Sequence, residues 1–339
     1  MSQDLYTVVG CGAIGGTLAV HLDAYGIPVQ LVDADNEHVE AIRRNGLQLR
    51  TPNENFVARL PAYGLNDAPS ELGRVLLAVK AQATDRASSW IADRLTSDGY
   101  VVSMQNGLNE TVIARHVGAD RTIAAFVDLF ADVLEPGIIK DGGAGAMALG
   151  EYVGGISERV RALAEDLGHW GTPVLSDNVV GFNWSKLGFS AMLTGAALAD
   201  DDMSELIDRH RPAMNEMVAE VFDVAAAEGI NLEGFDAFDP AAYVRGVDPA
   251  INAAGTDALV AWLKTQTKTR SGVWRDIAVR KRPTEVPAKF DPVIQMAHSY
   301  GLKVPLIETM VRLIKQLEAG QATMSEEHIF DLDRQAAAK

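Results

Sequence analysis

A glycine-rich turn near the N-terminus constrains the fold of this 339-residue chain more than any other feature. It follows the apolar run Leu5–Val9 and opens a helical pattern that continues to Tyr25. The first glycine of such a motif permits a tight turn, the second lets the backbone approach a pyrophosphate, and the third lets the helix pack on the strand. The helix N-terminus then attracts phosphate through its N–H groups and dipole. The turn predicts a bound dinucleotide, held by Gly10, Cys11, Gly12, Ala13, Ile14 and Gly15, with Gly16 next in the chain.

An acidic residue ends the next predicted strand. Asp33 closes the run Val29–Val32, about 20 residues after the turn, where a carboxylate accepts hydrogen bonds from the adenosine ribose and repels the 2′-phosphate of NADP. Asp35 adds negative charge, and Arg43 is the first arginine of the chain. The agreement of strand, helix and acid favours a ligand over a plain glycine-rich turn. It predicts NAD rather than NADP, although a solvated turn acid is the alternative for Asp33.

The first half of the chain alternates between strand and helix patterns, and its apolar runs are typical of strands buried on both faces of a parallel sheet. A glycine-rich stretch over residues 135–151 predicts a short antiparallel appendage. Strand signals vanish from about Ser176. We therefore predict an α/β fold with a Rossmann dinucleotide-binding domain at residues 1–176 and an all-α domain at residues 177–339. Further strands are expected at Val75–Val79, Tyr100–Met104 and Thr122–Val127, and helices at Glu37–Asn45, Phe182–Ala199, Ser204–Glu228, Asp257–Gln266, Pro292–Tyr300, Pro305–Ala319 and within Gln321–Lys339.

Two polar residues follow further strands of the predicted sheet. Lys80 ends the run Val75–Val79, and Asn106 follows the run Tyr100–Met104. Taken alone, each is typical of a surface lysine or a turn asparagine. The carboxyl ends of parallel strands meet at one edge, where ligands bind. Together with Gly12 and Asp33, the two residues predict a single ligand-binding edge.

The composition excludes several classes of partner. With 30 basic and 46 acidic residues the formal charge is −16, which disfavours nucleic acid and anionic membranes as partners. The single cysteine forms no internal disulfide and fits a reducing cytoplasm. The seven histidines never approach ligand spacing, so we expect no metal site. Neither a signal peptide nor a membrane-spanning apolar stretch is predicted.

The helical half contains two candidate segments. Lys186, Ser190 and Thr194 are spaced one helical turn apart and share a face of an otherwise largely apolar helix. A lysine there either serves a function or extends its ammonium to solvent. The second segment runs from Ser271 to Glu285 and contains the densest basic stretch, which taken alone indicates a solvated helix face with local ion pairs.

These residues together resemble the ketopantoate reductases (2-dehydropantoate 2-reductases). The resemblance covers nearly the whole chain and depends on an ordered set of motifs rather than on any one of them. It implies a Rossmann domain followed by a helical domain, with the active site in the cleft between them. The motifs are the glycine turn, Val79-Lys80, Gln105-Asn106-Gly107, Trp184-Ser185-Lys186-Leu187, Arg282-Pro283-Thr284-Glu285, Gly301-Leu302-Lys303-Val304-Pro305 and Leu317-Glu318-Ala319-Gly320.

The resemblance also implies roles for single residues. Lys186 matches the catalytic lysine, which protonates the carbonyl oxygen of the substrate as hydride arrives from the nicotinamide. The resemblance places Lys80 and Asn106 near the cofactor and the reacting carbon, and it implies that the backbone of Ala131 contacts the cofactor. It places Glu285 near the nicotinamide and implies that Ser271 binds the substrate carboxylate.

The chain departs from the family pattern where the family holds its ligands. Ser190, Thr194 and Ser204 stand where relatives have asparagines, and Ala34 stands where an arginine normally reads the NADP phosphate. The stretch from Asp276 to Glu285 is one residue longer than usual. We therefore expect an NAD-preferring oxidoreductase acting on a changed small hydroxy or keto substrate. Its substrate-binding residues would be Asn106, Lys186, Ser190, Thr194 and Ser271.

Several alternatives stay open. The chain could be a true 2-dehydropantoate 2-reductase, or belong to a neighbouring class such as the glycerol-3-phosphate or opine dehydrogenases, which share the two-domain plan. A non-catalytic NAD-sensing regulator is a third alternative. Trp262, Trp274 and several methionines of the helical half indicate either core packing or a homodimer interface.

Overall fold

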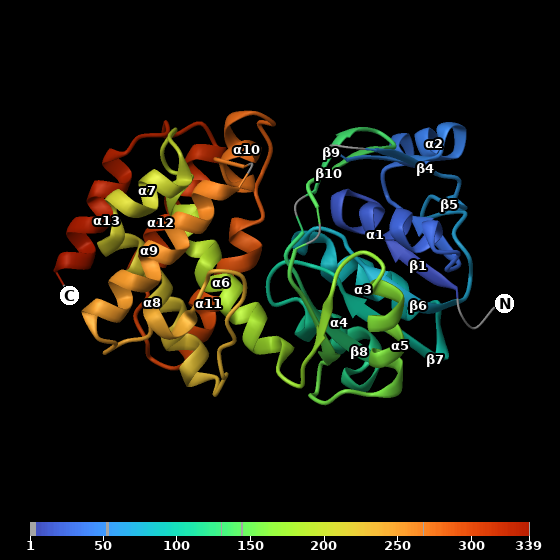
Figure 1. The fold of residues 1–339 in the computed structure, drawn as a ribbon, viewed down its shortest axis with the longest axis horizontal. Coiled ribbons are helices and arrows are strands. Elements are labelled where there is room, and N and C mark those ends of the chain that lie inside the picture. The colour runs from blue at the N-terminus through green and yellow to red at the C-terminus, as the bar shows by residue number, and fades with distance from the viewer. Residues whose placement is uncertain (1–4, 52–53, 130, 144, 267, 339) are drawn as a thin grey trace. The chain divides into compact units, whose positions relative to one another are not determined.

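The structure, a computed structural model, describes residues 5–51, 54–129, 131–143, 145–266 and 268–338 (Figure 1). The chain forms two compact units that divide between Val180 and Gly181. The division falls inside the first turn of helix α6 (Val179–Ala196), a few residues after the 176/177 boundary expected from the sequence. Each unit is described by itself.

The described residues of the first unit build an eight-stranded sheet with the order β12-β11-β8-β7-β6-β1-β2-β5. All its neighbouring strands are parallel except β11, which runs antiparallel to β8. This is the predicted Rossmann-type α/β fold. The strands are β1 (Tyr6–Val9), β2 (Val29–Val32), β5 (Ala62–Tyr63), β6 (Leu72–Leu77), β7 (Leu95–Ser103), β8 (Thr122–Val127), β11 (Met147–Glu151) and β12 (Pro173–Leu175).

Helices cover both faces of this sheet because its strands are apolar on both sides. On one face α1 (Ala13–Ala24), α2 (Asn36–Asn45) and α5 (Glu158–Leu167) pack against side chains such as Val8 and Leu31. On the other face α3 (Thr84–Ala92) and α4 (Glu110–Val117) pack against side chains such as Val9 and Val32. Successive side chains of β1 and β2 point to opposite faces of the sheet, so the core of this unit is divided into two layers.

A second, four-stranded sheet lies against α1, with the order β4-β3-β10-β9. It corrects the prediction of one antiparallel appendage over residues 135–151, because β11 joins the main sheet instead. Strands β9 and β10 instead join the hairpin β3–β4, which was not predicted, and β3 runs parallel to β10. Helix α1 is therefore enclosed between two sheets. The strands are β3 (Leu47–Arg50), β4 (Asn55–Ala58), β9 (Ala131–Glu135) and β10 (Ile138–Asp141).

The second unit is helical, and an isolated bridge between Phe235 and Phe238 is the only β-pairing among its described residues. The predicted helix Ser204–Glu228 is wrong: it is two helices, α7 and α8, because the chain turns at His210 and Pro212 starts the second one. Helices α9 and α11 begin earlier than predicted. The helices after α6 are α7 (Met203–Arg209), α8 (Arg211–Ala227), α9 (Pro249–Thr265), α10 (Gly272–Ala278), α11 (Val286–Ser299), α12 (Pro305–Glu318) and α13 (Glu327–Ala337).

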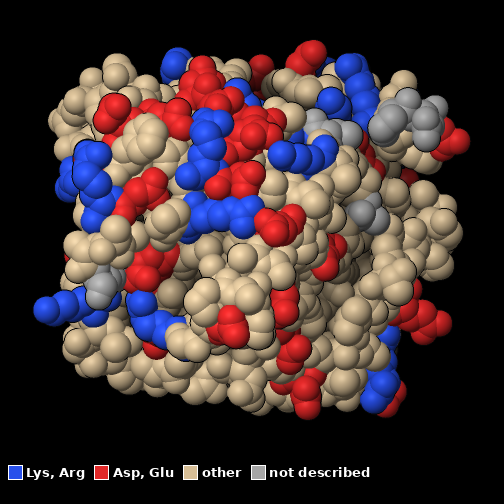
Figure 2. Space-filling model, turned by 60° about the vertical axis from the view of Figure 1, so that its left-hand side comes forward, with Lys and Arg blue, Asp and Glu red and all other residues tan. Residues whose placement is uncertain are grey.

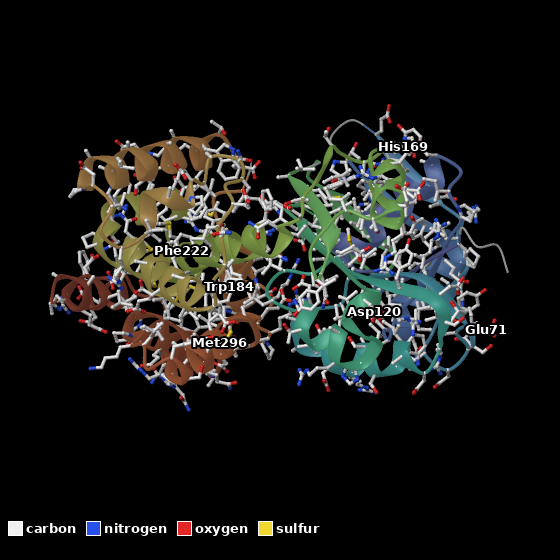
Figure 3. The ribbon with its side chains drawn as sticks, turned by 90° about the horizontal axis from the view of Figure 1, so that it is seen from below. Glu71, Asp120, His169, Trp184, Phe222 and Met296 are labelled. Carbon is white, nitrogen blue, oxygen red and sulfur yellow. The ribbon has the colours of Figure 1, made fainter. Side chains whose placement is uncertain are left out.

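Helix α6 packs closely on α8 inside this unit. A Cβ atom on Gly188 would lie 2.5 Å from the ring of Phe222, so the glycine permits the close approach. Trp184 and Phe222, both labelled in Figure 3, are almost fully buried. The half-buried Trp262 ring lies 6.5 Å from that of Phe189, and the indole of Trp274 donates to Asp200 at 3.1 Å. Both tryptophans thus have contacts within the chain, and the homodimer stays a prediction.

Charges of both signs are mixed on the surface. On the face drawn in Figure 2, Lys and Arg side chains lie among Asp and Glu. Among the described helices, none has the length and apolar character needed to cross a bilayer. Within the same residues no group of three or more His, Cys, Asp or Glu side chains is placed to hold a metal ion.

Candidate active site

The glycine turn between β1 and α1 has the geometry that the motif predicts. Gly10 has a φ of +92°, and a Cβ there would lie 2.8 Å from the backbone nitrogen of Val79. A Cβ on Gly15 would lie 2.1 Å from the carbonyl oxygen of Gly10. A Cβ on Gly12, in contrast, would meet nothing within 4 Å. The first and third glycines therefore serve the fold, and the second leaves open space over the backbone.

A dinucleotide fits this turn. Helix α1 is 12 residues long, and its N-cap, Gly12, has no side chain to cap the first-turn amides. Those amides carry the positive end of the helix dipole, which stabilises phosphate. The open side of Gly12 gives a pyrophosphate room to approach them.

Gly16 serves the second sheet. A Cβ atom there would lie 2.2 Å from Cδ1 of Ile139 on β10 and 2.8 Å from the Cys11 carbonyl oxygen. Gly15 faces the main sheet, where its Cβ would lie 2.8 Å from Cγ1 of Val8. The two consecutive glycines thus let α1 approach a sheet on each side, and only the folded chain explains the second of them.

The Asp33 carboxylate is fixed to the turn by two backbone amides. Its Oδ2 accepts a hydrogen bond from the Cys11 amide at 2.7 Å, and its Oδ1 accepts one from the Asp35 amide at 2.9 Å. Asp35 in turn caps α2 by accepting from the amides of Glu37 and His38. The structure therefore brings Asp33 and the glycine turn together at the end of β2, while Ala34 beside it is exposed.

The predicted strand end at Lys80 needs a correction. Strand β6 ends at Leu77, and Lys80 is the N-cap of a short 3₁₀ helix, Ala81–Ala83. Asn106 likewise follows β7 after a short interval and precedes Gly107, whose φ is +98°. Both residues lie in the connections after the strands rather than at the strand ends.

A buried polar network ties these two connections together. Nε2 of Gln105 donates to the Val79 carbonyl and to the Thr84 hydroxyl, at 2.7 Å each. The Thr84 hydroxyl donates to Asn109 at 3.1 Å, and Asn109 donates to the Asn106 carbonyl at 2.9 Å. The network holds the loops that carry Lys80 and Asn106. Sequence reasoning named Gln105 only as part of the Gln105-Asn106-Gly107 motif and assigned no role to Thr84 or Asn109, because the hydrogen bonds among them join segments that no local pattern links.

Glu110, in the first turn of α4 beside this network, is almost fully buried. Burial raises the pKa of its carboxyl from 4.5 to about 7, although hydrogen bonds from Ser103 and from the backbone amides of Asn109 and Glu110 lower it in part. The folded state therefore holds a proton that the unfolded state releases. The stabilisation that this raised pKa gives the folded state is complete below pH 4.5, and it is lost as the pH rises through about 7.

We expect Glu110→Gln to remove this pH dependence. The free energy of unfolding of the variant, relative to the original chain, should rise by about 2 kcal/mol between about pH 5 and about pH 8. Urea denaturation of both proteins at the two pH values measures the difference. An equal difference at both values would show that the Glu110 carboxyl keeps its ordinary pKa.

The predicted residues of the second unit lie on α6, α10 and α11. Lys186, Ser190 and Thr194 share one face of α6, and the Thr194 hydroxyl donates to the Ser190 carbonyl at 2.7 Å. Ser271 is the N-cap of α10 and accepts from the Trp274 amide at 3.2 Å. Glu285 is the N-cap of α11. In the first unit, Ala131 is the first residue of β9.

The basic stretch after Ser271 contains local ion pairs, which its sequence taken alone also indicated. Oδ1 of the buried Asp276 lies 3.2 Å from Nη1 of Arg280 and 2.8 Å from Nη2 of Arg282. Ser204, which the resemblance aligns with an asparagine of the family, donates its hydroxyl to Asp202 at 2.7 Å. These groups stabilise the fold of their own segments.

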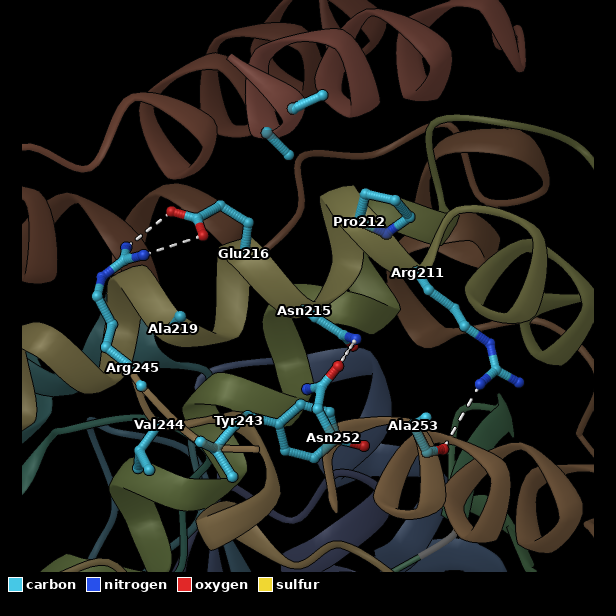
Figure 4. Close-up of a pocket in the computed structure, with 14 residues that line it drawn as sticks. Arg211, Pro212, Asn215, Glu216, Ala219, Tyr243, Val244, Arg245, Asn252 and Ala253 are labelled. Atoms are coloured by element: carbon cyan, nitrogen blue, oxygen red, sulfur yellow. Dashed lines mark hydrogen bonds and ion pairs between the residues drawn. The ribbon is translucent and has the colours of Figure 1, made fainter. Parts of the chain in front are cut away.

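A depression of about 480 Å³ opens between α8, α9 and the 243–247 segment (Figure 4). Its charged side chains are paired within the unit: Arg245 with Glu216 and Asp223, and Arg211 with Asp208 and Asp257. None of the residues predicted for the active site lines it. The depression is therefore distinct from the predicted site residues, and its charges are already paired within the unit.

Comparison with known proteins identifies the family. The model "Ketopantoate reductase PanE/ApbA" matches residues 6–154, and its C-terminal counterpart matches residues 178–318. A 2-dehydropantoate 2-reductase from Mesorhizobium japonicum is 29% identical over 92% of this chain and 97% of its own length. One from Halobacterium salinarum is 25% identical over 91% of this chain and 97% of its own.

Solved structures share the fold. A complex of D-mandelate dehydrogenase with NADH superposes with a TM-score of 0.79 at 24% identity, covering 94% of this chain and 99% of that one. A PanE/ApbA family ketopantoate reductase from Ralstonia eutropha gives a TM-score of 0.78 at 23% identity, covering 94% and 99%. With both family models matched in order along the two units, the chain belongs to the ketopantoate reductase family of NAD(P)-dependent oxidoreductases, which act on CH–OH groups.

Proposed function

We propose that this chain is an NAD-preferring dehydrogenase or reductase that interconverts a small hydroxy compound and its keto form. The observation that carries the proposal is the Asp33 carboxylate, fixed at the end of β2 by the Cys11 and Asp35 amides at 2.7 and 2.9 Å. A carboxylate held there accepts hydrogen bonds from ribose hydroxyls and repels a 2′-phosphate. Ala34, which is exposed beside it, offers no positive charge to such a phosphate.

For the chemical step we propose Lys186 as general acid and base. When bound, a nicotinamide dinucleotide supplies or accepts the hydride. In the reductive direction the Lys186 ammonium stabilises the negative charge that develops on the carbonyl oxygen and donates its proton there. In the oxidative direction the neutral amine removes the hydroxyl proton. Lys80, Asn106, Ala131 and Glu285 are proposed to hold the cofactor, as the family resemblance implies.

We propose that the substrate differs from 2-dehydropantoate. Ser190, Thr194 and Ser204 are shorter than the asparagines of the family pattern, and two of their hydroxyls donate within the chain, Thr194 to Ser190 and Ser204 to Asp202. Ser190, Thr194 and Ser271, with Asn106 and Lys186, are the proposed substrate contacts. D-mandelate dehydrogenase, which shares the fold, has been solved in complex with NADH and anilino(oxo)acetate. This supports a small acid as the substrate class.

The second candidate function is 2-dehydropantoate reduction, which is favoured by the similarity to the 2-dehydropantoate 2-reductases of Mesorhizobium japonicum and Halobacterium salinarum. Initial rates of the purified protein, measured with NADH and NADPH over a series of keto acids and with NAD over the matching hydroxy acids, separate the two. We expect a higher kcat/KM with the NAD couple and with a substrate other than 2-dehydropantoate. Rapid reduction of 2-dehydropantoate with NADPH and slow reduction with NADH would overturn the proposal.

The turn itself gives a prediction that separates folding from binding. Gly12→Ala should leave the Tm nearly unchanged, because its Cβ meets nothing within 4 Å, but should weaken NADH binding at least tenfold because the methyl occupies the space of the pyrophosphate. Gly15→Ala should cost about 1–3 kcal/mol of stability, because its Cβ meets the Gly10 carbonyl at 2.1 Å.

Thermal unfolding and NADH titration of both variants measure these effects. Gly73→Ala in β6, whose Cβ also meets nothing within 4 Å, is the control and should change neither quantity greatly. A Gly12→Ala variant that binds NADH as tightly as the original chain would argue against pyrophosphate binding at this turn.

A further inference from the structure

His38 on α2 is buried and makes two hydrogen bonds to the backbone of distant segments. The Gly137 amide donates to its Nδ1 at 3.0 Å, and its Nε2 lies 3.0 Å from the Cys11 carbonyl oxygen. A backbone amide only donates, so Nδ1 is the acceptor, and Nε2 must carry the proton that goes to Cys11. Both bonds therefore require the neutral Nε2–H tautomer of His38.

The His38 bond determines the direction of an amide in the glycine turn. In a planar trans peptide the C=O of one residue and the N–H of the next point in opposite directions. Since the Cys11 carbonyl points toward His38, the Gly12 N–H points away from it. Gly12 is the residue over whose backbone the turn is open. His38 thus orients the amide at the position where a pyrophosphate has room to approach.

The turn is held on the other side of Cys11 as well. The Cys11 amide donates to Asp33 at 2.7 Å, so side chains from the β2–α2 segment hold both peptide groups of this residue. His38 adds a link to the β9–β10 turn through Gly137, whose φ is +76°. Ile139, two residues further on, is the residue whose Cδ1 contacts α1 at Gly16.

We propose that His38 is a positioning residue for dinucleotide binding, which acts through the Cys11 carbonyl to aim the Gly12 amide at the cofactor phosphates. The proposal rests on the proposed dinucleotide function of the turn. His38 itself touches no ligand in this role. Its loss should therefore weaken dinucleotide binding and leave the chemical step unchanged.

The test compares His38→Phe with His38→Gln. Phenylalanine keeps a ring of similar size and loses both hydrogen bonds, whereas glutamine keeps one donor and one acceptor about as far apart as the two imidazole nitrogens. We expect His38→Phe to raise the Kd and KM for NADH about tenfold, with kcat at saturating NADH within about twofold. His38→Gln should remain within about threefold of the original Kd.

The control is His169→Phe, an exposed histidine of the same unit that stacks on Tyr25 at 4.0 Å, and it should leave the Kd unchanged. An unchanged Kd in His38→Phe, or equal weakening in the Phe and Gln variants, would overturn the proposal. If His38→Phe does not fold, His38→Met carries the same comparison. Since NADH titration needs no substrate, failure of the proposed reaction would appear separately, as tight NADH binding without turnover.

Discussion

We expect Lys186→Ala to lower kcat by about three orders of magnitude while the Kd for NADH changes less than about twofold. The variant removes both the proton donor and the positive charge that stabilises the developing alkoxide, and such groups contribute about 10²- to 10⁴-fold. Lys186 lies on α6 in the helical unit, whereas the glycine turn and Asp33 lie in the first unit. Steady-state rates and NADH titration of the same preparation measure the two effects.

Lys264→Ala is the matched control for this prediction. Lys264 lies on α9 in the same unit, where its ammonium pairs with Glu205 at 2.9 Å on the surface. Its removal should leave kcat within about twofold, since surface ion pairs contribute little. If Lys186→Ala turned over at the original rate, another group would have to be the general acid. If neither protein turned over any substrate, the alternative of a non-catalytic NAD-sensing regulator would gain support.

The second large effect concerns the coenzyme. We expect Asp33→Asn combined with Ala34→Arg to change the ratio of kcat/KM for NADH and NADPH by about 10²- to 10³-fold in favour of NADPH. The asparagine removes the charge that repels the 2′-phosphate. Its single oxygen still accepts from the Cys11 amide, while the bond from the Asp35 amide is lost. The arginine, at an exposed position, adds a charge-assisted contact to that phosphate, which contributes about 1.5–3 kcal/mol.

Asp98→Asn is the control for the coenzyme prediction, because it makes the same charge change elsewhere in the unit. Asp98 is exposed in the first part of β7, so it lies toward the amino end of a parallel strand, at the opposite edge from Asp33. The ratio of kcat/KM for NADH and NADPH should be the same in Asp98→Asn as in the original chain. An unchanged ratio in the double variant would remove Asp33 from coenzyme choice.

Sequence patterns predicted β1, β2, β6, β7 and β8 of the main sheet because these strands contain continuous apolar runs, but they missed β5 and β12 and placed β11 in the appendage. They missed the second sheet for two reasons. Leu47–Arg50 and Asn55–Ala58 have partly exposed side chains, unlike the fully buried β1 and β2 of the same length, so their apolar patterns are weak. In addition, β3 pairs in parallel with β10, far away in the chain, and no local pattern encodes that pairing. The break before α8 was predictable, since Pro212 favours the first turn of a new helix.

The candidate site was predictable where its residues follow strands in sequence. The glycine turn and Asp33 each carry a recognisable motif, and the structure joins them through the Cys11 amide. His38 gave no such signal, because a buried histidine in an amphipathic helix reads as a core residue. Its role depends on contacts with Cys11 and Gly137, which only the folded chain brings together.

The enclosure of α1 between two sheets has a consequence for the order of folding. The strands β1, β2, β6, β7 and β8 are complete once the chain reaches Val127, but β10, which lies between β3 and β9, comes later. Contacts between distant segments form slowly, and chains emerge from the ribosome N-terminus first. Pulse-labelled hydrogen exchange should therefore show that the amides of β3 and β10, which bond to each other, become protected later than those of β1, β2 and β6. The glycine turn, among the first parts of the chain to be synthesised, would then be among the last of its unit to reach its final form.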